Sequence, residues 1–179
     1  MTLMILAHPQ FEHSIANKTI CDIVSREEPN LEIRNIHQLY PNYQIDVKAE
    51  QTALLAHDLV ILQYPMYWFN MPAILKIWFD EVFTYQFAYG SKGNKLKGKY
   101  LLPSLTIGQP AVNFKEKDHF LVDDFLQPVK RSAEYAQMNY LDYIALYGVS
   151  IVSGYPESEI KDKACMHAQK LLAVIQQYK

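Results

Sequence analysis

The chain has 179 residues, of which 17 are Lys or Arg and 19 are Asp or Glu, so its formal charge is −2. Neutralising nucleic-acid phosphates needs a basic excess that is missing here, so no nucleic-acid partner is expected. Hydrophobic residues make up 50% of the chain, which is enough for a sizeable core and argues against disorder. The length predicts a single domain over residues 1–179.

The cysteines and the N-terminus indicate a compartment. Cys21 and Cys165 lie far apart and lack metal-ligand or redox spacing, as is typical of reducing compartments. The apolar start carries no Lys or Arg and is interrupted by His8-Pro9, so it predicts a strand and not a signal peptide. No run approaches the about 18 apolar residues of a membrane span. We expect a cytoplasmic protein, or one that docks peripherally at the inner face of a membrane.

Short apolar runs alternate along the chain with helical patterns. The runs that predict strands by length and apolar content are Leu3 to Ala7, Leu31 to Asn35, Leu59 to Tyr64, Tyr100 to Thr106 and Ala145 to Val152. The predicted helices are Ser14 to Arg26, Lys48 to Ala56, Met71 to Phe83, Phe120 to Met138 and Ser158 to Tyr178. Ser14 is a suitable N-cap for the first helix, and Pro72 is tolerated near the start of its helix.

This alternation predicts the α/β class, because each parallel return of a sheet needs a crossover. Five strands fit a flavodoxin-like doubly wound parallel sheet in the order 2-1-3-4-5, with helices on both faces. In such sheets ligands bind beyond the carboxyl ends of the strands. The residues that follow Ala7, Tyr64 and Thr106 are therefore the candidates for a ligand site.

Two of these segments have distinct chemistry. The residues from His8 to Asn17 end by opening a helix, and free N–H groups at a helix N-terminus, with Ser and Asn beside them, suit a phosphate. An ordinary cap at Ser14 and a hydrogen-bonded loop histidine at His8 also explain the segment, and caps of this kind are common. Between Pro65 and Pro72, a stiff loop exposes aromatic side chains that suit either a flat ring or a dimer contact.

The third segment, Thr106 to Pro110, contains a glycine at Gly108 that permits close backbone approach to a ligand or simply makes a turn. Each segment alone is weak evidence, but all three fall where the fold model places the pocket. Metal chemistry has little support, because the six histidines form no HExxH or closely spaced ligand pair.

The chain resembles the NAD(P)H:quinone oxidoreductases of the flavodoxin-like fold, especially the ancillary subunits of bacterial glutathione-gated potassium efflux (Kef) systems. The motifs that carry the resemblance occur in order over about the first two-thirds of the chain: Ala7-His8-Pro9 with Ser14-x-Ala16-Asn17, Tyr64-Pro65-Met66-Tyr67-Trp68, Pro72-Ala73-Ile74-Leu75-Lys76-x-Trp78-Phe79-Asp80-x-Val82-Phe83, Phe87-Ala88-Tyr89-Gly90 and Leu96-x-Gly98-Lys99.

The resemblance implies a non-covalent flavin, FMN or alternatively FAD, with NADH or NADPH as electron donor. Its phosphate is expected near His8, Ser14, Ile15, Ala16 and Asn17. Its ring system is expected against two further segments, Pro65, Met66, Tyr67 and Trp68, and Leu105, Thr106, Ile107, Gly108 and Gln109. It also implies a homodimer in which Phe87 and Tyr89 reach the partner's flavin.

Many members of this family place a Tyr and a His after the glycine turn to stabilise charge on the flavin. The corresponding residues here are Phe114 and His119, and Gln109 replaces a second glycine of the turn. Since Phe114 cannot donate a hydrogen bond, we expect weaker hydride transfer than in the Tyr-bearing relatives. A surface histidine in a polar run is the other interpretation of His119.

The sequence therefore predicts an enzyme that takes two electrons from NAD(P)H through FMN to a quinone-like acceptor. The alternative is a flavin-binding regulatory subunit that docks on a membrane potassium antiporter, which the altered turn at Gln109 and Phe114 motivates.

Overall fold

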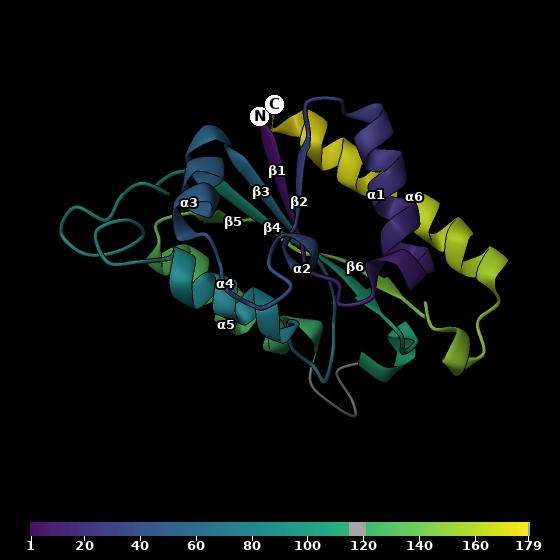
Figure 1. The fold of residues 1–179 in the computed structure, drawn as a ribbon. Coiled ribbons are helices and arrows are strands. Elements are labelled where there is room, and N and C mark those ends of the chain that lie inside the picture. The colour runs from purple at the N-terminus through teal and green to yellow at the C-terminus, as the bar shows by residue number, and fades with distance from the viewer. Residues whose placement is uncertain (115–120, 179) are drawn as a thin grey trace.

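The computed structural model describes residues 1–114 and 121–178, and within them parallel strands form one sheet. The strands are β1 (Thr2–Leu6), β2 (Glu32–Asn35), β3 (Leu59–Pro65), β4 (Tyr100–Ile107), β5 (Asn139–Tyr140) and β6 (Ile144–Tyr147). Their order is β2-β1-β3-β4-β5, and β6 also pairs with β4 (Figure 1). The predicted flavodoxin-like order is thereby confirmed.

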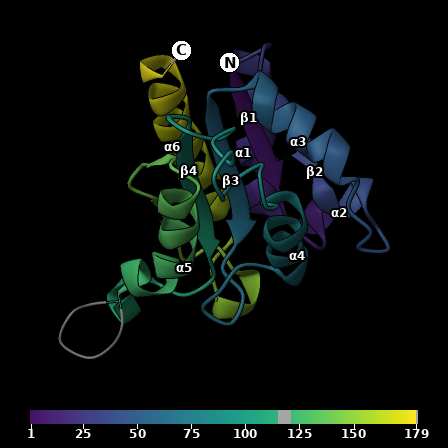
Figure 2. The same cartoon turned by 90° about the vertical axis from the view of Figure 1, so that its left-hand side faces the viewer.

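Helices cover both faces of the sheet (Figures 1 and 2). The α-helices are α1 (Ile15–Glu27), α2 (Ile36–Leu39), α3 (Val47–Ala56), α4 (Ala73–Val82), α5 (Val122–Tyr135) and α6 (Glu157–Gln177), with short 3-10 turns η1 (Phe11–His13), η2 (Ala111–Phe114) and η3 (Ile151–Ser153). Helices α1 and α6 pack side by side on one face, and α3, α4 and α5 cover the other. The central strands β1 and β3 are buried along their whole length, as expected of a sheet covered on both faces.

The predicted fifth strand, Ala145 to Val152, is wrong in its bounds. In that range the structure has only β6, which begins at Ile144 and pairs with the end of β4. A separate short strand, β5, precedes it in the chain and pairs with the beginning of β4. Strand β6 ends at Tyr147 because Gly148 takes a left-handed backbone conformation, with φ 65°. The helix predicted to reach Met138 ends at Tyr135, and Gln137 just beyond it has φ 60°, which an α-helix excludes. Its predicted start, Phe120, lies outside the described residues.

A buried carboxylate connects β2, α3 and α4. Glu50 in α3 is fully buried, and its Oε1 accepts hydrogen bonds from Arg34 Nε (2.8 Å), Arg34 Nη2 (2.6 Å) and the Tyr40 hydroxyl (2.6 Å). Its Oε2 accepts a hydrogen bond from Trp78 Nε1 at 2.8 Å. Burial lowers the pKa of Arg34, but the hydrogen bonds and charge of Glu50 outweigh this effect, so the pKa of Arg34 is raised above its ordinary value. The carboxylate thus satisfies four donors from three other segments on the α3/α4 side of the sheet.

Candidate functional site

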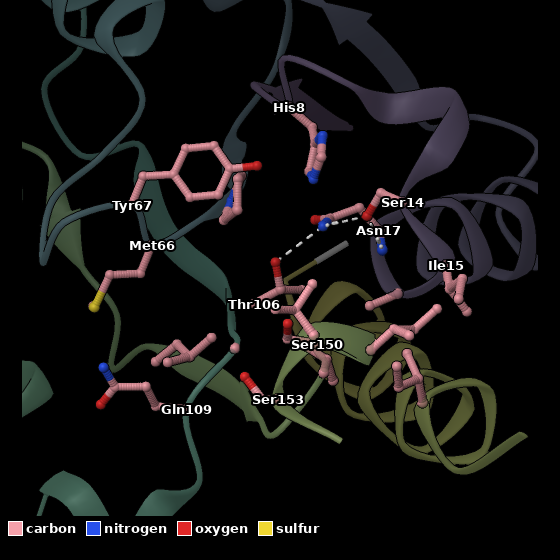
Figure 3. A pocket seen from close by; sticks show the side chains of 18 of the residues that line it. His8, Ser14, Ile15, Asn17, Met66, Tyr67, Thr106, Gln109, Ser150 and Ser153 are labelled. Carbon is pink, nitrogen blue, oxygen red and sulfur yellow. Dashed lines mark hydrogen bonds between the residues drawn. The ribbon is translucent and has the colours of Figure 1, made fainter. Parts of the chain in front are cut away.

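A cavity of about 670 Å³ lies beyond the carboxyl ends of β1, β3 and β4 (Figure 3). Its size falls within the range of about 300–1,000 Å³ typical of small-molecule sites. Its walls come from the start of α1, the loop after β3, the turn after β4 and the segment after β6. The doubly wound topology predicts a ligand at this edge, where the strand order reverses.

The N-terminus of α1 forms one end of the cavity. Ser14 caps the helix, because its Oγ accepts a hydrogen bond from the Asn17 N–H at 3.2 Å. The next two backbone N–H groups, of Ile15 and Ala16, have no hydrogen-bond partner within the described residues. They line the cavity at the positive end of the helix dipole, where an anion is stabilised.

His8 follows β1 and projects into the cavity between Tyr67 and Asn17 (Figure 3). Its Nδ1 accepts a hydrogen bond from the Gln10 N–H at 3.1 Å, so in the neutral ring the proton is on Nε2. Burial, and secondly the nearby His37, lower the pKa of His8 from 6.5 to about 4. The ring is therefore neutral near pH 7 and offers Nε2–H as a donor.

Polar side chains continue from this end of the cavity into the interior. Asn17 Nδ2 donates hydrogen bonds to Ser14 Oγ at 3.0 Å and to Thr106 Oγ1 at 2.9 Å (Figure 3). Because Asn17 uses both amide protons on these hydroxyls, the hydroxyls accept from it and keep their own protons for other partners. Ser14 Oγ also accepts the Asn17 backbone N–H, so both of its lone pairs are in use. Ser14 and Thr106 thus present O–H donors to the cavity that they line.

The loop after β3 makes an aromatic corner, residues 66–70. Tyr67 and Asn70 exchange two backbone hydrogen bonds of 3.0 Å, and between them Trp68 and Phe69 have positive φ values of 49° and 62°. Left-handed backbone at bulky residues is strained and persists only where the surroundings hold it. The Phe69 ring packs on Phe125 at 5.1 Å, whereas Trp68 is 94% exposed. The corner offers flat apolar surface at the mouth of the cavity.

The opposite wall combines the turn after β4 with the segment after β6. A Cβ built on Gly108 would lie 3.2 Å from the Ser150 Cβ, so glycine permits the close approach of these two segments. The Gln109 carbonyl accepts a hydrogen bond from the Gly148 N–H at 2.9 Å. This contact holds Ser150 and Ser153 at the cavity, where Figure 3 shows both side chains.

The structure brings most of the predicted site residues into this one cavity: His8, Ser14, Ile15, Ala16, Asn17, Pro65, Met66, Tyr67, Trp68, Thr106, Ile107, Gly108, Gln109 and Phe114. Leu105, which was expected beside these residues, does not line the cavity, because side chains alternate along β4 and that of Leu105 is fully buried in the core on the α4/α5 face. Tyr89 does not line the cavity and contacts Tyr85 and Tyr135 instead, in the loop that leads into β4. His119 lies outside the described residues.

The sequence analysis missed other lining residues, namely Gln10, His13, Phe69, Val149, Ser150, Ile151, Val152, Ser153 and Ile160. Phe69 could have been predicted, because it lies in the same aromatic loop between Pro65 and Pro72. Val149 to Val152 belong to the predicted fifth strand, and Ser153 directly follows it, so the prediction does not place these residues in a loop at the carboxyl edge of the sheet. A glycine at 148 was the available signal for a strand end.

A buried histidine behind the cavity makes the fold sensitive to acid. Burial, with Lys170 as a second cause, lowers the pKa of His167 from 6.5 to about 4. As the pH falls from about 6.5 toward 4, the unfolded chain binds the proton first, so stability is lost in this window and is fully present above it. Replacing His167 by Gln, which does not titrate, should remove up to about 3 kcal/mol of this loss. Urea unfolding of both proteins at pH 7 and pH 4.5 measures the difference, and parallel pH profiles would contradict it.

The parallel sheet and the cavity at its carboxyl edge define a doubly wound α/β protein with a cavity of the size that small molecules occupy. The chain belongs to the family described as flavodoxin-like fold, whose model matches residues 1–172. None of the helices in the described part of the chain has the length and apolar character needed to cross a membrane.

Among its relatives, the uncharacterized NAD(P)H oxidoreductase YdeQ of Bacillus subtilis (strain 168) is 36% identical over 168 residues, which is 93% of this chain and 85% of that protein. General stress protein 14 of Treponema denticola, solved in complex with FMN, has 33% identity and a TM-score of 0.86 and covers 96% of this chain and 98% of its own. An NADPH-quinone reductase from P. pentosaceus has 26% identity and a TM-score of 0.77, with 95% and 96% coverage.

Proposed function

We propose that this protein binds FMN and acts as an NAD(P)H oxidoreductase that passes two electrons to a quinone or a similar acceptor. The observation that carries the proposal is the pairing, within one cavity, of an anion-binding end at α1 with the aromatic corner formed by residues 66–70. The relatives support it, because one was solved with FMN and two are described as NAD(P)H oxidoreductase or NADPH-quinone reductase.

The anion-binding end suits the phosphate of FMN. The N–H groups of Ile15 and Ala16 and the hydroxyls of Ser14 and Thr106 are donors without a competing acceptor in the described residues, and they meet around one end of the cavity. A phosphate has several acceptor oxygens and a negative charge that the helix dipole stabilises. FAD is the alternative cofactor, and its second phosphate and adenosine would extend beyond this end.

The rest of the cavity suits the flavin ring system. Pro65 to Trp68 and Ile107 to Gln109 supply two backbone walls, one of which carries the aromatic side chains of the corner. When bound, FMN accepts a hydride from reduced nicotinamide and passes two electrons to the acceptor. The chain's own residues orient the ring, supply hydrogen-bond donors to it and, through Phe69 and Phe125, hold the corner in place. NADH and NADPH are both candidate donors.

The homodimer belongs to this proposal as the assembly that gives Tyr89 a role. Tyr89 packs between Tyr85 and Tyr135, whose side chains are 63% and 71% exposed. These three rings form a surface outside the chain's own cavity that suits a contact with a second copy. Phe87, which precedes Tyr89 in the same loop, is buried and fixes the loop against the core. Molar mass by light scattering tests the dimer.

The experiment that tests the function starts with the absorption spectrum of the purified protein and with FMN titration of any colourless fraction. Consumption of NADH and of NADPH is then followed with and without a small quinone. We expect a yellow protein, or one that takes up FMN, and quinone-dependent oxidation of one or both donors. The matched control is Glu157→Gln, which breaks an exposed ion pair with Lys161 on α6 and should leave both properties unchanged. A protein that neither carries nor binds FMN refutes the proposal.

Phe114 is the site of a gain-of-function prediction. It ends η2, lines the cavity and packs on Tyr147 with ring centroids 5.7 Å apart. Phe114→Tyr adds a hydroxyl donor at the cavity wall, and one well-aimed donor to developing charge is worth about 100- to 1,000-fold in rate. We expect at least about a tenfold faster NAD(P)H oxidation. Val112→Tyr, on the exposed side of the same turn, is the control and should not accelerate the reaction. An unchanged rate in Phe114→Tyr counts against this role.

Docking on a potassium antiporter, the alternative function, stays a prediction that co-purification with an antiporter tests.

A further inference from the structure

Five polar side chains cross the apolar layer between the sheet and the α1/α6 helices. Each is at most 4% exposed: Asn17, Gln63, Ser104, Thr106 and His167. Apolar residues of the same layer surround them, such as Leu6, Ile61 and Ala164. A buried polar group costs free energy unless it is hydrogen-bonded, and all five have partners. The line begins on α6 and ends at the cavity.

The hydrogen bonds of this line run in one direction. The Ser104 hydroxyl donates to Gln63 Oε1 at 2.6 Å, and Gln63 Nε2 donates to Asn17 Oδ1 at 2.8 Å. Ser104 Oγ lies 2.7 Å from His167 Nε2. Since Ser104 has one proton and gives it to Gln63, its bond with His167 requires the imidazole to donate from Nε2.

The direction of the line decides what the cavity offers to a ligand. In the observed order, Asn17 points its N–H groups at Ser14 and Thr106, whose protons are then free for the cavity. In the reverse direction the amide oxygen and nitrogen of Gln63 and of Asn17 would exchange places. The hydroxyls of Ser14 and Thr106 would then donate to Asn17 Oδ1. An anion would then meet oxygen lone pairs in place of protons.

We propose that His167, which lies outside the cavity on α6, is a positioning residue that donates its Nε2 proton to Ser104 and so directs the hydroxyl protons of Ser14 and Thr106 toward the FMN phosphate. This inference rests on the proposed function. Hydrogen bonds in such a line polarise one another, so a donor fixed at one end stabilises the same direction throughout. The effect is expected to be specific for the phosphate, because the proposed function places the flavin ring system against the other wall of the cavity.

The test compares FMN with riboflavin, which lacks the phosphate, by fluorescence titration of the flavin-free protein. The variants are His167→Leu, which removes the donor, and His167→Gln, whose amide restores an N–H at similar reach. We expect His167→Leu to weaken FMN binding about tenfold and riboflavin binding by less than about twofold. His167→Gln should keep the wild-type preference. A purely structural role would weaken both ligands equally.

The failures of the two proposals are distinguishable. Wild-type protein that binds neither flavin refutes the proposed function, and wild-type protein that binds FMN no better than riboflavin refutes the phosphate site. A wild-type preference that persists in His167→Leu refutes only the role of His167. Nitrogen-15 NMR of the wild-type imidazole needs no variant and covers the case in which His167→Leu does not fold. The proton is expected on Nε2, and the Nδ1–H tautomer overturns the inference.

Discussion

Replacing Asn17 by Asp is expected to weaken FMN binding by about a thousandfold, with little change in the shape of the side chain. The carboxylate accepts hydrogen bonds and has none to donate, so Ser14 and Thr106 would turn their protons toward it and away from the cavity. It also places a negative charge beside the phosphate end. Like charges in close proximity repel by several kcal/mol at an effective dielectric constant of about 20, and about 4 kcal/mol corresponds to a thousandfold.

The measurement is again a titration of flavin-free protein with FMN and with riboflavin. Riboflavin binding should fall much less, because that ligand has no charge to repel. Asn42→Asp is the matched control, since it adds the same charge at an exposed loop position whose Oδ1 accepts a hydrogen bond from Gln44 N–H. Equal losses for FMN and riboflavin in Asn17→Asp would show that the substitution damages the cavity as a whole, against the phosphate assignment.

The largest effect on stability is expected from Glu50→Gln. The amide keeps an oxygen for Arg34 and Tyr40, but its NH₂ group faces the Trp78 Nε1–H, so two donors oppose each other. It also leaves the Arg34 guanidinium, whose side chain is 18% exposed, without its buried counter-charge. Breaking a buried ion pair by removing one partner costs about 3–5 kcal/mol. Urea unfolding should show a loss of this size.

Glu157→Gln on α6 is the control here as well. It removes an exposed partner of Lys161 and should lower the free energy of unfolding by less than about 1 kcal/mol. FMN affinity of the folded Glu50→Gln protein should stay near wild type, since Glu50 does not line the cavity. A loss no greater than that of the exposed pair would mean that the four hydrogen bonds contribute little net free energy.

Hydrophobic patterning was sufficient for the sheet order and for most helices, because strands buried on both faces appear as continuous apolar runs. The run from Leu59 to Tyr64 is such a case, and the structure extends it by one residue. Patterning failed at the edge of the sheet, where the fifth position is divided into β5 and β6. Short edge strands bury little surface and leave only a weak periodic signal.

The cavity was predictable in outline because topology alone places the residues after β1, β3 and β4 at one edge. Its interior support was not. Gln63 stands in an apolar strand and His167 in a helix far along the chain, and only the packing of α6 on the sheet brings them into one hydrogen-bonded line. Side chains alternate between the two faces of β4, so Leu105 points away from the side on which Ser104 and Thr106 lie. A prediction that took Leu105 to Gln109 as one continuous wall did not account for this alternation.

The left-handed pair at Trp68 and Phe69 has a consequence for evolution under heat. Each residue in this conformation costs on the order of 1–3 kcal/mol of stability. Glycine would remove this cost, but it would also make the loop at the cavity mouth more flexible. Selection for thermal stability alone would therefore favour glycine at these two positions, whereas selection for binding in the adjacent cavity would keep the aromatic side chains. The two aromatic side chains are thus a trade-off between stability and function, in which a preorganised wall of the cavity is kept at the expense of a lower free energy of unfolding.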